Sequence, residues 1–154
     1  MKKIIPDMVF QEETNECGLS CIAMLAQTQN IHCSLPALRE IFPASDHGTS
    51  LSDLSVILQQ IGIATAPVLF DHAELHALPF PSILHYGASH YVLLAWRKGD
   101  YVCVMNPAIG QQWLPFSALK KEISGYALIL EESPGVIDQQ APVIAGAQQE
   151  MPRA

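Results

Sequence analysis

The sequence predicts an α+β fold in which an N-terminal helical half packs on a C-terminal antiparallel sheet. Between residues 16 and 62 apolar side chains recur every three or four positions, which is the helical period. Between residues 65 and 130 they alternate in short runs that are rich in β-branched and aromatic residues. Helices followed by antiparallel strands are typical of the α+β class.

Three helices are expected in the first half of the chain. They cover Glu16–Gln29, Leu35–Phe42 and Leu51–Ile61. Ser34 is placed to cap the second helix, and Ser50 with Asp53 three residues later has the pattern of a capping box for the third. Gly62 supplies the residue that commonly ends a helix.

Five strands are expected in the second half. They cover Thr65–Phe70, Ser82–Tyr86, His90–Trp96, Tyr101–Asn106 and Tyr126–Leu130. Asp71–Leu78 is interpreted as a short helical crossover, and residues 97–100 (Arg-Lys-Gly-Asp) as the turn of a hairpin. Both faces of His90–Trp96 are apolar, which marks a central strand.

The 154 residues are expected to form one folded body over residues 8–132, followed by a tail or linker over residues 133–154. The segment from Pro134 onward has no aromatic residue, three prolines and a stretch rich in Gln and Ala. Such a composition does not bury enough apolar surface to order itself. The body, by contrast, contains nearly all the apolar side chains.

Composition excludes several classes of protein. The net charge of −7 is unsuited to nucleic acids and to a basic membrane-surface helix. The longest apolar stretches, such as Tyr91–Trp96, are far shorter than the roughly 20 residues of a membrane span. The N-terminus lacks the apolar region of a signal peptide, so we expect a cytosolic protein with reduced cysteines. The absence of a GxxxxGK[ST] motif indicates that this chain alone is no ATPase.

Cys17 is the candidate nucleophile. It lies at the start of the first expected helix, where the helix dipole favours a thiolate, and Gly18 after it allows a close backbone approach. The other cysteines (Cys21, Cys33 and Cys103) lie within apolar patterns and are interpreted as structural.

A cysteine nucleophile needs a base, and His90 is the best candidate because it opens the central strand. Four other histidines are interpreted as solvated surface side chains: His32, His47, His72 and His76. His85 lies five positions earlier, too far to share a simple strand face with His90.

Asn106 is the candidate partner that orients the base, because it ends the strand paired with that of His90. In an antiparallel hairpin the numbers of two directly paired residues have a constant sum. If that sum is 198, the side chains of His90 and Asn106 share one face of the hairpin; if it is 197, they lie on opposite faces. The sequence leaves this register open, and Asn106-Pro107 also fits a simple turn. Gln11, six residues before Cys17, is a candidate oxyanion donor together with the Cys17 N–H.

Taken together, these residues resemble the papain-like cysteine peptidase domain at the N-terminus of bacteriocin-exporting ABC transporters. The resemblance covers roughly residues 8–132 and is carried in order by Gln11, residues 16–21 (Glu-Cys-Gly-Leu-Ser-Cys), residues 48–51 (Gly-Thr-Ser-Leu), residues 89–92 (Ser-His-Tyr-Val), residues 106–108 (Asn-Pro-Ala) and Gly110.

The resemblance implies that the domain cuts leader peptides after a Gly-Gly pair at the cytosolic face of the inner membrane, coupled to export of a bacteriocin-like peptide. It implies Cys17 as nucleophile, His90 as base and acid, Asn106 as orienting residue and Gln11 as oxyanion donor. The implied partners are the leader peptide and the transmembrane and ATPase domains of an exporter, with no cofactor and no metal. The apolar side chains around Leu51–Ile61 are candidates for the leader-binding groove.

The chain departs from the family in one place, since the family usually has Asp before the proline and this chain has Asn106. Asn still accepts a hydrogen bond from the imidazole but offers it no full negative charge. We expect slower or pH-shifted catalysis.

Three alternatives stay open at this point. A docking domain that binds leaders without cutting them is disfavoured by the presence of Cys17, because such domains of haemolysin-type exporters lack the nucleophile; Asn106 keeps it under consideration. A thiol acyltransferase would use the same Cys and His with an acceptor other than water. A zinc site from Cys17, Cys21, His32 and Cys33 is disfavoured because Leu19 and Ile22 continue an ordinary core stripe.

Overall fold

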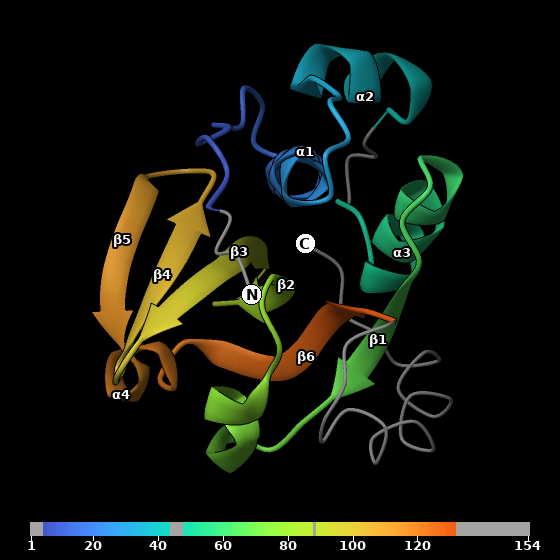
Figure 1. Ribbon diagram of the computed structural model, residues 1–154. Coiled ribbons are helices and arrows are strands. Elements are labelled where there is room, and N and C mark those ends of the chain that lie inside the picture. Colours follow the sequence, from blue (N-terminus) through green and yellow to red (C-terminus); the bar gives the residue numbers. More distant parts are fainter. Residues whose placement is uncertain (1–4, 44–47, 88, 132–154) are drawn as a thin grey trace.

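Helices and strands lie in separate layers, as the computed structural model shows (Figure 1). The structure describes residues 5–43, 48–87 and 89–131, so His47 and the expected tail lie outside the described residues. The elements are α1 (Cys17–Thr28), α2 (Leu35–Ile41), α3 (Leu51–Gln60), β1 (Thr65–Leu69), η1 (His72–Ala77), β2 (Ser82–Tyr86), β3 (His90–Lys98), β4 (Tyr101–Asn106), β5 (Gly110–Pro115), α4 (Phe116–Leu119) and β6 (Ile123–Leu130).

Helix α1 is buried almost along its whole length, because its sequence is apolar or small on every side. It packs on β3 of the sheet and is covered by α2 and α3, and Figure 1 shows it end-on between these elements. Its start and end agree with the sequence prediction to within one residue.

The predicted caps of α2 and α3 are both confirmed. The Ala37 N–H donates to Ser34 Oγ at 3.2 Å. Ser50 Oγ accepts from the Asp53 N–H at 3.1 Å, and the Asp53 carboxylate accepts from the Ser50 N–H at 3.3 Å. These bonds satisfy backbone donors that the first turn of a helix leaves without partners.

The sheet has the strand order β1-β6-β2-β3-β4-β5, and every neighbouring pair is antiparallel. The prediction of β3 as a central strand is confirmed. Strand β6 starts at Ile123, three residues earlier than predicted. Strand β5 was missed, because it lies at the sheet edge, is partly exposed and contains two glutamines in place of β-forming residues.

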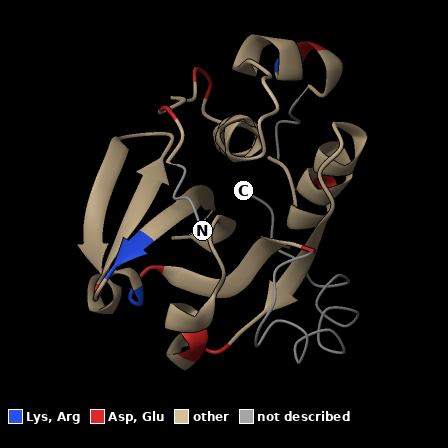
Figure 2. Cartoon of the chain, in the orientation of Figure 1, with Lys and Arg blue, Asp and Glu red and all other residues tan. Residues whose placement is uncertain are grey.

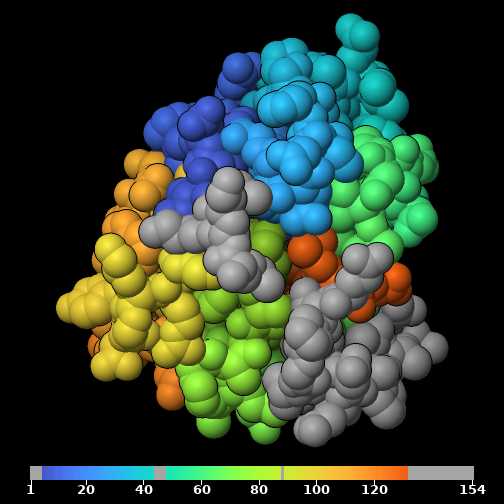
Figure 3. Space-filling model, viewed as in Figure 1, coloured from blue at the N-terminus to red at the C-terminus, as the bar shows by residue number. Residues whose placement is uncertain are grey.

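Two hydrophobic cores lie on opposite faces of this sheet. The larger one joins α1, α2 and α3 to the sheet and contains Leu19, Leu54 and Leu93. The smaller one lies on the other face, under η1 and α4, and contains Leu75 and Leu119. The predicted packing of the helical half on the sheet is confirmed, and Figure 3 shows the helical residues, blue to green, next to the yellow and orange strands. The second core was not predicted.

A β-bulge in the β3–β4 hairpin decides which side chains share a face. Next to the turn, paired numbers add up to 199, as for Trp96 and Cys103. Beyond the irregularity at Ala95 they add up to 198, as for Leu93 and Met105. This shift places His90 and Asn106 on the same face of the hairpin, which is the first of the two registers considered from the sequence.

Among the residues that the structure describes, no helix combines the length and the apolar character that crossing a bilayer requires.

Candidate active site

Cys17 is the first residue of α1, and its side chain is buried, with 3% of its surface exposed. The sulfur accepts hydrogen bonds from the backbone N–H groups of Tyr91, Gly18 and Cys17 itself, each of which lowers the pKa of the thiol. Burial acts in the opposite direction and dominates, so the pKa lies above its ordinary value of 9.0. The sequence-based expectation of a lowered pKa is therefore wrong, because it counted the helix start and not the burial.

Gly18 allows α1 to begin in direct contact with α3 and β3. A Cβ atom at this position would lie 2.9 Å from Leu54 Cδ2 and 3.5 Å from Tyr91 Cδ2. The first of these distances is shorter than side chains tolerate, so the predicted close backbone approach is confirmed. Cys17 therefore lies against the start of β3, where the backbone N–H of Tyr91, the residue after His90, reaches its sulfur.

His90 and Asn106 are hydrogen bonded, with His90 Nε2 and Asn106 Oδ1 2.7 Å apart. The Ala108 N–H donates to the same Oδ1 at 2.9 Å. Since a backbone N–H only donates, the Asn106 atom that it contacts must be the oxygen, and His90 Nε2 must then carry a proton. In the neutral imidazole this leaves Nδ1 as the acceptor, which is the form that a general base needs.

The backbone of Gln11 lies next to the residue that follows Asn106, since the Gln11 N–H donates to the Pro107 carbonyl at 3.1 Å. Its side-chain amide donates to the carbonyl of Glu13 at 3.1 Å, and the carbonyl of Thr14 is 3.5 Å away. The amide oxygen is buried and has no hydrogen-bond partner among the described residues. One N–H of the amide is thus committed to the loop that leads to Cys17.

That loop is closed by Glu16, whose side chain is 2% exposed. Its carboxylate accepts from the N–H groups of Glu12 at 3.2 Å and Glu13 at 3.1 Å, and it is bound by Nε and Nη2 of Arg39 from α2. The hydrogen bond from Arg39 is the largest of the effects that lower the pKa of Glu16, and burial opposes it. Sequence reasoning missed this ion pair, because α2 meets the loop only in the folded chain.

The remaining histidines and cysteines are not part of the candidate set, although Cys21 lies one helical turn from Cys17 in α1. His32, His72 and His76 are exposed, as predicted. His85 is buried, with Nδ1 2.9 Å from Ser124 Oγ. All four cysteines are in the described part of the chain, and none forms a disulfide.

The described residues contain no group of three His, Cys, Asp or Glu side chains that could hold a metal ion, which leaves the zinc alternative without support.

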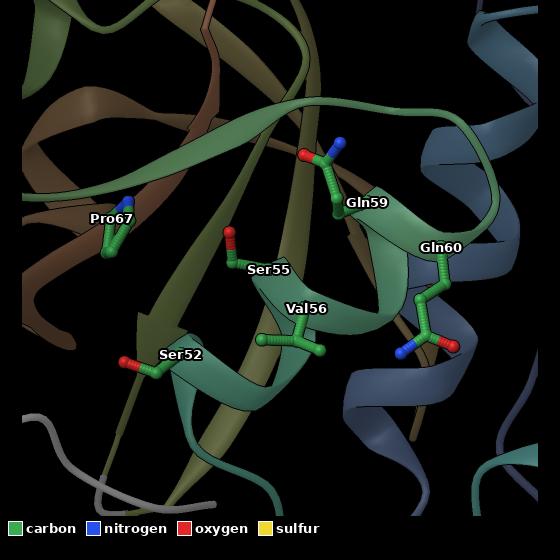
Figure 4. Close-up of a pocket in the computed structure, with 6 residues that line it drawn as sticks. All are labelled: Ser52, Ser55, Val56, Gln59, Gln60 and Pro67. Atoms are coloured by element: carbon green, nitrogen blue, oxygen red, sulfur yellow. The ribbon is translucent and has the colours of Figure 1, made fainter.

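The apolar stripe of α3 does not form a groove. Its side chains, which include Leu51, Leu54 and Leu58, are buried in the core, so the candidate groove at Leu51–Ile61 is wrong in this respect. The outer face of α3 instead borders a pocket of about 520 Å³ whose lining is part polar and part apolar (Figure 4), formed by Ser52, Ser55, Val56, Gln59, Gln60 and Pro67. Exposed apolar side chains next to the site are Phe10 and Ile109, 53% and 63% exposed.

Comparison with known proteins gives one consistent family. The chain matches the Peptidase C39 family over residues 6–135. It is 34% identical over 121 residues, or 79% of its length, to the probable microcin-H47 secretion/processing ATP-binding protein of Escherichia coli. It is 30% identical over 135 residues, 83% of its length, to the lactococcin-G-processing and transport ATP-binding protein of Lactococcus lactis. The chain spans 17% and 18% of the lengths of these two relatives.

Solved structures share the fold. The double glycine motif protease of an AMS/PCAT transporter, solved in complex with the leader peptide, superposes with a TM-score of 0.75 at 24% identity, covering 82% of this chain and 97% of that one. The peptidase domain of Streptococcus ComA, a bi-functional ABC transporter, gives a TM-score of 0.71 at 21% identity, covering 80% and 96%. The family match extends over most of the chain and includes every residue of the candidate site, and we conclude that this chain belongs to the Peptidase C39 family of cysteine peptidases.

Proposed function

We propose that this chain is a cysteine endopeptidase that cuts leader peptides after a Gly-Gly pair, and that it works as a domain of a peptide exporter. The observation that carries the proposal is the His90–Asn106 hydrogen bond, which leaves the basic imidazole nitrogen Nδ1 available on the residue next to Tyr91, whose N–H reaches the Cys17 sulfur. The relatives named for processing and transport, and the neighbour solved with a leader peptide, support the substrate class.

In this mechanism His90 Nδ1 takes the proton of the Cys17 thiol as the sulfur attacks the carbonyl carbon of the second glycine. The resulting oxyanion is bound by the Cys17 N–H and by the Gln11 amide, which keeps its bond to the Glu13 carbonyl and gives up the longer contact with the Thr14 carbonyl. The imidazolium then gives its proton to the leaving amine, and the peptide C–N bond breaks. Water, deprotonated by His90, attacks the thioester, and the sulfur leaves and is reprotonated.

Asn106 holds the imidazole in the required orientation throughout this cycle, as its oxygen is itself fixed by the Ala108 N–H. Burial raises the pKa of the Cys17 thiol, so the thiol needs a base, and His90 supplies that base in the proposed mechanism.

Transmembrane and ATPase domains of an ABC exporter are the proposed partners, with the peptidase at the cytosolic face of the membrane. The support is that the relatives named for transport and processing are much longer than this chain.

Leader cleavage followed by mass spectrometry tests the proposal. The protein is mixed with peptides that carry a Gly-Gly leader, and we expect one cut after the second glycine. Cys17→Ala should abolish the cut, whereas Cys33→Ala, a control at a half-buried thiol, should leave it intact. A peptide with Ala in place of the second glycine should resist cleavage.

Other outcomes separate the alternatives by product mass. Leader binding without a cut, with Cys17 unreactive toward alkylating reagents, would contradict the proposal and favour the docking domain. A product heavier than the hydrolysed leader by the mass of an added amine minus one water would identify an acyltransferase.

A further inference from the structure

We propose that Arg39 is a positioning residue for the reaction at Cys17. It lies on α2, binds Glu16 and Glu12 together, and so holds residues 11–16, the segment that carries Gln11 and leads directly into the nucleophile. The inference rests on the proposed function and extends it to a side chain that does not touch the substrate.

The contacts form one connected cluster. Glu16, the residue before Cys17, is 2% exposed, and its carboxylate is bound by Nε and Nη2 of Arg39 and by the N–H groups of Glu12 and Glu13. Arg39 Nη2 also donates to Glu12 Oε1 at 2.6 Å. A guanidinium that binds two carboxylates in this way fixes their relative position, because its donors lie in a rigid plane.

The same cluster fixes the place of Gln11. The Gln11 amide is anchored on the carbonyls of Glu13 and Thr14, within the loop whose N–H groups Glu16 binds. Movement of this loop therefore moves both the side-chain oxyanion donor and the start of α1. A displacement of about 1 Å at such a site is enough to slow catalysis strongly.

Charge gives a second reason for the pair. A carboxylate next to the nucleophile opposes thiolate formation unless a cation neutralises it. Arg39 is the sole Lys or Arg in residues 5–43 and 48–62, the described part of the helical half; the other described cations lie toward the end of β3 and after α4 (Figure 2). No second cation of this region can replace it.

The titratable and charged groups on the elements around Cys17 are Cys21 of α1, His90 and Tyr91 of β3, Arg39 of α2, and Glu12 and Glu16 of the loop, while α3 contributes the apolar Leu54 at this contact. A test must therefore change Arg39 alone and together with Glu16, while the other groups around Cys17 stay as in the wild type.

The test measures the rate of Cys17 alkylation against pH, together with kcat and KM of leader cleavage. In Arg39→Met, which keeps the aliphatic stem, we expect the alkylation profile to move up by about one pH unit. We also expect kcat to fall by about tenfold with KM changed less than about twofold, because the transition state and not leader binding is affected. In the double variant Arg39→Met/Glu16→Gln the alkylation profile should return to that of the wild type.

Arg39→Lys separates charge from geometry. It keeps the positive charge but not the planar fork, so we expect an unshifted alkylation profile and a reduced kcat. Circular dichroism checks that each variant is folded, and Arg39→Lys still tests the inference should Arg39→Met fail to fold. Arg97→Met and Glu40→Gln, at exposed or half-exposed positions outside the cluster, are the matched controls and should behave as the wild type.

A folded Arg39→Met with an unchanged profile and kcat would overturn the inference, as would a double variant whose profile stays shifted. The alkylation arm needs no substrate. If the wild type failed to cut any Gly-Gly leader, the proposed function would be wrong, yet the effect of Arg39 on the thiol would still be measured.

Discussion

At the scale of single residues, the Asn106 oxygen accepts hydrogen bonds from the Ala108 N–H and from the imidazole N–H of His90, so it fixes the imidazole ring without adding a charge. This contact was predicted from the sequence as one of two registers. The sequence alone shows that residue 106 carries an amide, whereas the hydrogen bond from the Ala108 N–H to this amide could be found only in the structure.

Asn106→Asp is expected to keep cleavage and to move the acidic limb of the pH–rate profile, where His90 becomes protonated, to higher pH. A carboxylate beside the imidazolium stabilises its charge, so deprotonation needs a higher pH. The measurement is kcat/KM for a Gly-Gly leader between pH 5 and 9. Complete loss of cleavage in a folded Asn106→Asp protein would show that this account of the position is wrong.

Asn106→Ala provides the contrast, because it removes the orienting oxygen altogether. We expect kcat to fall by roughly 10²-fold, which is the lower end of the range of 10²–10⁴-fold that positioned acid–base groups contribute.

Glu16 links the loop to stability as well as to chemistry. Because its pKa in the folded protein is lowered from 4.5, chiefly by the Arg39 hydrogen bond, its stabilising effect is present above pH 4.5 and is lost as pH falls through the lowered value. Glu16→Gln should therefore reduce the free energy of unfolding at pH 7 by about 1–3 kcal/mol and flatten its decline below pH 4.5. Urea unfolding between pH 3 and 7 measures both.

The matched control for that experiment is Glu13→Gln, which removes an exposed carboxylate from the same loop. An equal loss of stability in the two variants would contradict the role given to the buried ion pair.

At the scale of elements, the bulge at Ala95 is the feature on which the site depends. Had the register near the turn continued along β3, His90 and Asn106 would point to opposite faces of the hairpin. The sequence does not reveal the bulge, because Leu94, Ala95 and Trp96 are all apolar and no glycine marks the position.

Deletion of Ala95 removes the extra residue of the bulge and leaves the pairing of Leu94 with Val104 unchanged. We therefore expect a folded protein that retains cleavage within about tenfold. Insertion of a second alanine after Ala95 shifts the register by one residue and should abolish cleavage. The assay is leader cleavage, with circular dichroism to verify the fold; an inactive deletion variant beside an active insertion variant would contradict this account.

Most of the elements could be predicted from the sequence, and the features that could not be predicted depend on where the folded chain places them. The caps of α2 and α3, the buried α1 and five of the six strands follow from local patterns. Strand β5 did not, because an edge strand needs no apolar alternation. The direction of the Cys17 pKa and the Arg39–Glu16 pair also did not, since both depend on what the fold brings to the start of α1.

At the scale of the whole molecule, the described residues form two cores around one sheet, and the last core strand ends at Leu130. A chain that ends at Glu132 is expected to keep its melting temperature within about 2 °C and its cleavage rate unchanged, because it retains all of this last strand. A larger fall in melting temperature would require the free energy of unfolding to drop by about 0.5 kcal/mol or more. Thermal unfolding of both chains tests this, and a fall of more than about 5 °C would move the domain boundary toward the C-terminus.

The candidate site is shared between the two halves of the chain. The nucleophile belongs to the first helix, and its base and orienting residue belong to a hairpin made much later in synthesis. A ribosome-bound chain that has not yet released residues 90–106 into the folded sheet therefore carries Cys17 without its proposed base. Under the proposed mechanism, a nascent chain can cut a leader only once the hairpin has folded against the helix that was synthesised first.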